Sequence, residues 1–96
     1  MFTIAESKSI LGVLPEQFNS HDFIRLGVLT TPFPFLEMLR QYHGDFTVID
    51  AQIGTFLSRC AEQKSLPIFK SGERESETIV GTIQKCAIWN KTESVQ

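Results

Sequence analysis

The sequence predicts an α+β domain that is mainly α-helical, with a three-helix core followed by a small C-terminal β-hairpin. Apolar residues recur at spacings of three and four in successive segments between residues 20 and 63, as in amphipathic helices. Two short apolar runs between residues 64 and 91 are typical of strands. The chain has 96 residues, of which 42% are hydrophobic, and this suits a single domain with a modest core.

The clearest helix is expected between Asp45 and Lys64. Thr47 can cap its N-terminus, and Asp50 three residues later can complete a capping box. Apolar residues recur at helical spacing and make one face apolar. They are Ile49, Ile53, Phe56, Leu57 and Cys60. We expect Ile53 and Phe56, at the centre of this face, to be core residues.

The opposite face of this helix is small, polar and nearly uncharged. It carries Ala51, Thr55, Ser58 and Glu62, and it is flanked by Gln52 and Arg59. The solvent face of an amphipathic helix usually carries charged residues. The small side chains therefore indicate a surface that another molecule or segment can approach closely.

Residues 1–19 are expected to form an N-terminal extension that contains a short helix over residues 5–13 and a turn at residues 15–17. The first helix of the core is expected from His21 to about Leu29. Ser20 precedes it as a good N-cap residue.

The next core helix is expected from Pro32 to His43, because proline is tolerated throughout the first turn. Gly44 is a natural residue to follow its C-terminus. Only Asp45 and Phe46 then separate this helix from the cap of the next one. Two helices joined by a tight turn that contains glycine form a helix-turn-helix pattern.

The C-terminal third predicts a hairpin over residues 64–91. Its first strand is expected at residues 66–70, its charged loop at residues 71–77 and its returning strand at residues 85–91. Residues 92–96 are expected to be a tail.

The charge balance weighs against strong non-specific affinity for nucleic acid. The net charge is −2, with −3 in residues 1–63 and +1 in residues 64–96. A domain that binds nucleic acid by itself is usually basic.

The two cysteines, Cys60 and Cys86, lie in apolar surroundings, so we expect both to be reduced and buried. There is no CxxC motif, and His21 and His43 show no ligand spacing with either cysteine. We therefore expect no metal site, and we place both histidines at the surface.

The N-terminus has no basic segment and only short apolar runs, so neither a signal peptide nor a membrane span is expected. Cytoplasmic residence follows as the expectation. The motifs of hydrolases, nucleotide-binding loops, dinucleotide sites and zinc proteases do not occur. We expect no enzymatic activity, no catalytic residues and no cofactor.

Three helices followed by a β-hairpin with a charged segment resemble a winged helix-turn-helix domain of bacterial type. The resemblance covers about residues 20–91. It rests on the order of the elements and on the run AQIGTFLSR, residues 51–59, which is similar to bacterial recognition helices. It implies a sequence-specific DNA-binding domain, in a transcriptional regulator or a mobile-element protein.

The resemblance implies that Gln52, Thr55 and Arg59 contact base edges in the major groove, and that Lys70 and Arg74 touch phosphates. The full set of candidate DNA-binding residues is Gln52, Thr55, Ser58, Arg59, Lys64, Lys70 and Arg74. A solvated helix flank and a solubilising hairpin tip are the more ordinary explanation of the same residues.

The alternative function is a winged-helix module that binds protein and not DNA. The expected partners are therefore duplex DNA, or else a protein partner or a second copy of the chain, and not a membrane. Trp89 is expected to be structural and to hold the returning strand against the helices, although a partner contact stays open. Phe33, beside two prolines, is another candidate for a partner contact.

Overall fold

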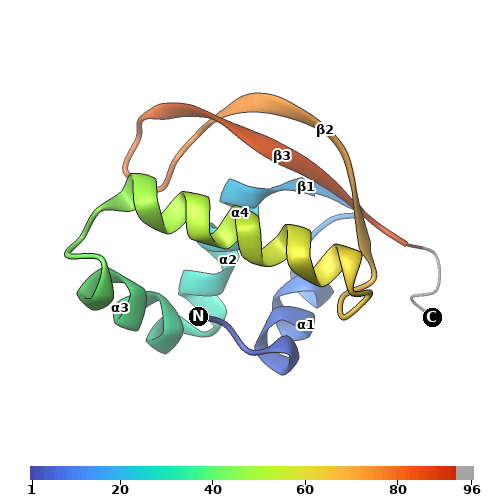
Figure 1. Ribbon diagram of the computed structural model, residues 1–96, viewed down its shortest axis with the longest axis horizontal. Coiled ribbons are helices and arrows are strands. Elements are labelled where there is room, and N and C mark those ends of the chain that lie inside the picture. The colour runs from blue at the N-terminus through green and yellow to red at the C-terminus, as the bar shows by residue number, and fades with distance from the viewer. Residues whose placement is uncertain (93–96) are drawn as a thin grey trace.

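A computed structural model of the protein describes residues 1–92. This part of the chain forms four helices and a three-stranded antiparallel sheet (Figure 1). The elements in chain order are α1 (Ile4–Val13), β1 (Gln17–Asn19), α2 (Ser20–Thr30), α3 (Pro32–Gln41), α4 (Phe46–Glu62), β2 (Ile68–Glu77) and β3 (Ile83–Lys91). The α+β class is confirmed. Helix α1 matches the short helix expected over residues 5–13, whereas β1 is a strand that was not expected.

Strand β3 lies in the centre of the sheet, between β1 and β2. Trp89 of β3 is paired with Phe18 on one side and with Lys70 on the other. In Figure 1 the sheet forms the upper part of the molecule and the four helices lie beneath it. The last strand of the chain therefore joins the N-terminal strand to the hairpin.

The core lies where the helices meet the sheet. Trp89 is 1% exposed, and its indole Nε1–H donates a hydrogen bond of 3.0 Å to the hydroxyl of Ser20. Phe23, Ile24 and Ile49 are also almost fully buried. The structural role expected for Trp89 is confirmed, since a buried indole N–H needs an acceptor and Ser20 supplies it.

Residues 1–19 are part of the core, so their description as an extension is wrong. Phe2 is 3% exposed and packs edge-to-face on Phe23, with ring centroids 5.6 Å apart. A Cβ at Gly27 would lie 2.7 Å from Phe2, so only glycine leaves room for this ring. Gln17, which was expected in a turn over residues 15–17, begins β1. This strand forms because Phe18 is buried opposite Trp89.

Helix α4 begins one residue before the expected cap. Its N-cap is Asp45, whose carboxylate accepts hydrogen bonds from the backbone N–H groups of Thr47 and Val48 at 3.1 and 3.3 Å. Thr47 is therefore not the cap. Gly44, with a φ of 75°, turns the chain so that Asp45 arrives in the extended conformation that an N-cap requires.

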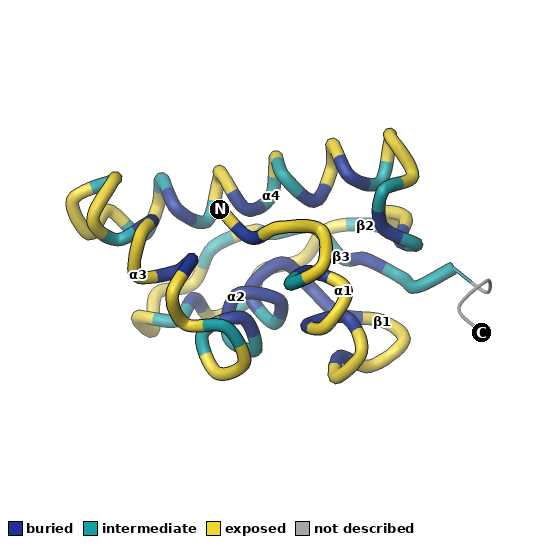
Figure 2. The backbone as a smooth tube through the Cα atoms, turned by 90° about the horizontal axis from the view of Figure 1, so that it is seen from below, coloured by how far each residue is buried: buried dark blue, intermediate teal, exposed yellow. Residues whose placement is uncertain are grey.

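The buried face of α4 consists of Ile49, Ile53, Leu57 and Cys60, and Figure 2 shows the alternation of buried and exposed residues along this helix. Phe56 is only partly buried and packs at the margin of the core. The expectation that Phe56 is a central core residue is wrong. Leu57 continues the spacing of four from Ile53, and Phe56 is turned by about 100° from it.

Helix α2 is capped by Asn19 and not by Ser20. The Asn19 side chain accepts a hydrogen bond of 2.8 Å from the N–H of Asp22, whose carboxylate accepts one of 3.1 Å from the N–H of Asn19. Ser20 is left as the acceptor for Trp89. Helix α3 ends at Gln41, two residues before the expected end at His43, which has a φ of 53°.

The two strands of the hairpin are longer than expected, and the loop between them is shorter. The segment 71–77, predicted as a charged loop, lies in β2, and the chain reverses over residues 78–82. The hydroxyls of Thr78 and Thr82 are 2.8 Å apart in this turn, and Gly81 has a φ of 90°. The charged side chains are compatible with a strand because most of them are exposed. Of the expected tail, residues 93–96 lie outside the described residues.

No helix within residues 1–92 is both long enough and apolar enough to cross a bilayer.

Leu57→Ala should lower the free energy of unfolding by about 2–5 kcal/mol, because it removes a fully buried side chain from the centre of the core. Phe56→Ala should cost less, since that ring is partly exposed. Urea unfolding of both variants measures the difference. A larger loss for Phe56→Ala than for Leu57→Ala would contradict the observed orientation of α4.

Candidate functional site: the groove between α4 and the hairpin

A hollow of about 400 Å³ lies between α4 and the β2–β3 hairpin. We call it the α4–hairpin groove. One wall is α4, the other is the hairpin, and residues at the start of α2 complete the lining. Strand β2 contacts α4, and a 3.5 Å hydrogen bond from Gln84 to Thr47 also joins the hairpin to this helix.

The α4 wall consists of small residues. Ala51, Gly54, Thr55 and Ser58 line the groove. No heavy atom lies within 4 Å of the position that a Cβ on Gly54 would take, so the space above the helix backbone is open. The Thr55 hydroxyl donates to the carbonyl of Ala51 at 3.0 Å. The small face predicted from the sequence is thus one wall of a groove.

The hairpin wall carries charge of both signs. Lys70 Nζ donates to Glu73 Oε2 at 3.0 Å, and both side chains are about half exposed. This hydrogen bond is the main cause that lowers the pKa of Glu73. Lys85 and Cys86 of β3 lie on the same wall. Because Glu73 pairs with Lys70, one of the two positive charges on this wall is offset.

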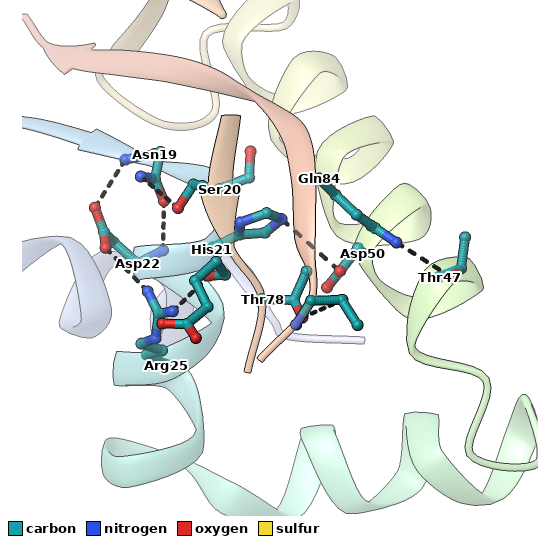
Figure 3. Close-up of polar contacts among 12 residues, drawn as sticks. Asn19, Ser20, His21, Asp22, Arg25, Thr47, Asp50, Thr78 and Gln84 are labelled. Carbon is teal, nitrogen blue, oxygen red and sulfur yellow. Dashed lines mark hydrogen bonds and ion pairs between the residues drawn. The ribbon is translucent and has the colours of Figure 1, made fainter. Parts of the chain in front are cut away.

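The start of α2 contributes His21, which meets Asp50 of α4 (Figure 3). His21 Nε2 lies 3.8 Å from Asp50 Oδ2, and the two side chains are 3% and 11% exposed. The surface position predicted for His21 is wrong, because packing of α2 against α4 covers it. His43 is exposed, as expected.

Burial shifts both groups toward their neutral forms. Desolvation lowers the pKa of His21, although attraction to Asp50 opposes the shift. Desolvation also raises the pKa of Asp50, and the charge on His21 opposes that shift. Burial therefore favours the neutral imidazole of His21 and the neutral carboxyl of Asp50.

Further polar contacts fasten the hairpin to α2 (Figure 3). Arg25 donates to the carbonyl of Glu77, and its guanidinium lies 3.5 Å from Asp22. Asn19 Nδ2 donates to Ser76 Oγ at 3.3 Å. The contacts of Arg25 with Glu77 and of Asn19 with Ser76 join residues more than 50 positions apart in the chain, whereas Arg25 and Asp22 lie in the same helix. Sequence spacing therefore gave no indication of them.

Five of the seven predicted DNA-binding residues lie in or beside the α4–hairpin groove. Thr55, Ser58 and Lys70 line the α4–hairpin groove. Gln52 and Arg59 are exposed on the solvent face of α4 beside it. The remaining two lie elsewhere. Lys64 follows the C-terminus of α4, with a φ of 59°, and lines a different hollow, whereas Arg74 is exposed on β2 opposite Cys86.

Within residues 1–92, no group of three or more His, Cys, Asp or Glu side chains is placed to hold a metal ion. Cys60 is buried as expected, whereas Cys86 is only half-buried, so that part of the prediction is wrong. Both thiols are free.

Comparison of the chain with protein-family models, with curated proteins and with solved structures gives no match. Inference about function therefore depends on the geometry and charge of α4 and the hairpin.

Cys86 should react with a water-soluble maleimide faster than Cys60 in the native protein. Cys60 is 4% exposed and burial raises the pKa of its thiol, whereas Cys86 lines the groove. Mass spectrometry of briefly labelled protein measures the two rates. Cys86→Ser serves as the control and should leave only the slow site. Faster labelling of Cys60 would contradict the packing of α4.

Proposed function

We propose that this protein binds duplex DNA through α4, in the manner of a winged helix-turn-helix domain. This proposal is supported by the order of the elements, in which the last helix leads directly into an antiparallel hairpin. The observation that carries the proposal is the exposed polar edge formed on α4 by Gln52, Thr55 and Arg59. The α4–hairpin groove adjoins this edge.

The side chains on this edge suit base reading. Arginine pairs with guanine and glutamine with adenine through two hydrogen bonds each, and a threonine methyl packs on a thymine methyl. Ala51 and Ser58 are small and exposed beside them, so the helix backbone can come close to base edges. We therefore assign base contacts to Gln52, Thr55 and Arg59.

Phosphate contacts are assigned to Lys70 and Arg74 on the hairpin, and Lys64 lies at the end of α4 as a further cation. Lys70 must leave Glu73 to make such a contact. With a net charge of −2, one copy has little non-specific affinity. Two linked copies would gain affinity because the second binding event becomes intramolecular, so we propose that the protein binds DNA as a dimer. We place this activity in the cytoplasm.

Arg59→Ala should cost about 1–3 kcal/mol on the preferred site and relax the preference at one base position, because it removes a contact to a base edge. Selection of binding sites from random duplexes, followed by gel-shift titration of selected and random duplexes, measures this.

Lys70→Ala and Arg74→Ala are the matched controls. Each should weaken binding to all duplexes about equally and lower the salt slope by about one unit, as expected for phosphate contacts. An equal loss on selected and random duplexes for Arg59→Ala would contradict its base-reading role. Absence of any duplex binding at low salt would reject DNA binding altogether.

A protein-interaction module is the second candidate, and one observation favours it. Leu29, Phe33 and Leu36 at the α2–α3 junction are 76%, 67% and 57% exposed. Large exposed apolar side chains are frequent in protein contacts. Sedimentation velocity of the wild type and of Phe33→Ala tests self-association through this surface. A monomeric wild type would remove the second copy as the partner.

A further inference from the structure

The contact between His21 and Asp50 joins α2 to α4 on the lining of the α4–hairpin groove. Nε2 and Oδ2 are 3.8 Å apart, beyond the usual length of a hydrogen bond. Among the described residues, neither His21 Nδ1 nor Asp50 Oδ2 has a hydrogen-bond partner, and both atoms are buried. Buried polar atoms in native proteins are usually paired, so this exception calls for an explanation.

The protonation state of His21 decides what its environment must supply. A neutral imidazole has one N–H and one lone pair. If Nε2 carries the hydrogen, that hydrogen faces Asp50 and Nδ1 needs no acceptor. Protonation adds a second N–H at Nδ1 together with a positive charge. The described residues offer this new donor no acceptor in its buried position.

The charges around His21 do not compensate for burial of its cation. Asp50 on α4 and Asp22 on α2 attract it, Arg25 on α2 repels it, and burial outweighs the attraction. The hairpin contributes both signs to the same groove, through Lys70, Glu73 and Lys85. Buried neutral histidines of this kind must leave their site or draw in water when they become charged.

We propose that His21 and Asp50 form a proton-controlled latch between α2 and α4, closed when His21 is neutral and opened when it is protonated. Opening moves the imidazole toward the groove and changes the position of the small face of α4 relative to the hairpin. The pKa of His21 lies below its ordinary value of 6.5, so the closed form predominates at pH 6.5 and above. It is lost as the pH falls through the lowered pKa.

The latch can be followed by NMR on the full chain, with the ring signals of both histidines and the backbone amides of Gly54 and Ala87 recorded from about pH 7.5 to about pH 5. His21 should titrate with a midpoint below 6.5. The Gly54 and Ala87 amides, on opposite walls of the groove, should shift with that same midpoint.

Two substitutions separate the latch from general acid effects. His21→Gln should abolish the coupled shifts at Gly54 and Ala87, whereas His43→Asn, at an exposed histidine, should leave them unchanged. Asp50→Asn should lower the midpoint of His21 further, since the carboxylate favours its protonation.

The proposal is overturned if the amides of the two walls do not move as His21 titrates in the wild type. It is equally overturned if they move alike in wild type and His21→Gln. Because the wild-type titration alone can give the first result, the test does not depend on how well either variant folds.

Discussion

Strand β3 is hydrogen-bonded to β1 on one side and to β2 on the other, and its position depends on Trp89. The indole is buried beneath the sheet and donates to Ser20 at the start of α2. The Trp89 side chain therefore joins the last strand to a core helix, while its backbone lies between β1 and β2. Pairing with β3 holds β1 in the sheet, whereas Phe2 and α1 are held in the core by their packing on α2. Trp89 also belongs to the hairpin that forms one wall of the α4–hairpin groove.

The functional geometry follows from this arrangement. With β3 fixed, β2 contacts α4, and the hydrogen bond from Gln84 of β3 to Thr47 joins the other end of the hairpin to the same helix. Small residues on α4 leave the groove open, and Thr55 links it to the exposed polar edge. The charge on the hairpin is mixed because Lys70 is paired with Glu73. Recognition of DNA would thus depend on shape and on a few directed contacts more than on a positive field.

Local patterns predicted the helices well and the long-range contacts poorly. The spacing of Ile49 and Ile53 located the buried face of α4, but the choice between neighbours Phe56 and Leu57 depends on the exact helix rotation. Strand β1 is only three residues long and is stabilised by a partner about 70 residues away, so no local pattern indicates it. The burial of His21 likewise results from packing of α2 against α4. The sequence predicted the small face of α4, but it did not predict that the hairpin would lie opposite this face.

The anchor at Trp89 is tested most directly by a double-mutant cycle with Trp89→Phe and Ser20→Ala, in which urea unfolding gives the coupling free energy. A coupling of about 0.5–1.5 kcal/mol is expected, because the two side chains share one buried hydrogen bond. Trp89→Phe alone should also destabilise the protein, since it shortens a side chain that is 1% exposed. Additive effects of the two substitutions, with no coupling, would contradict the account.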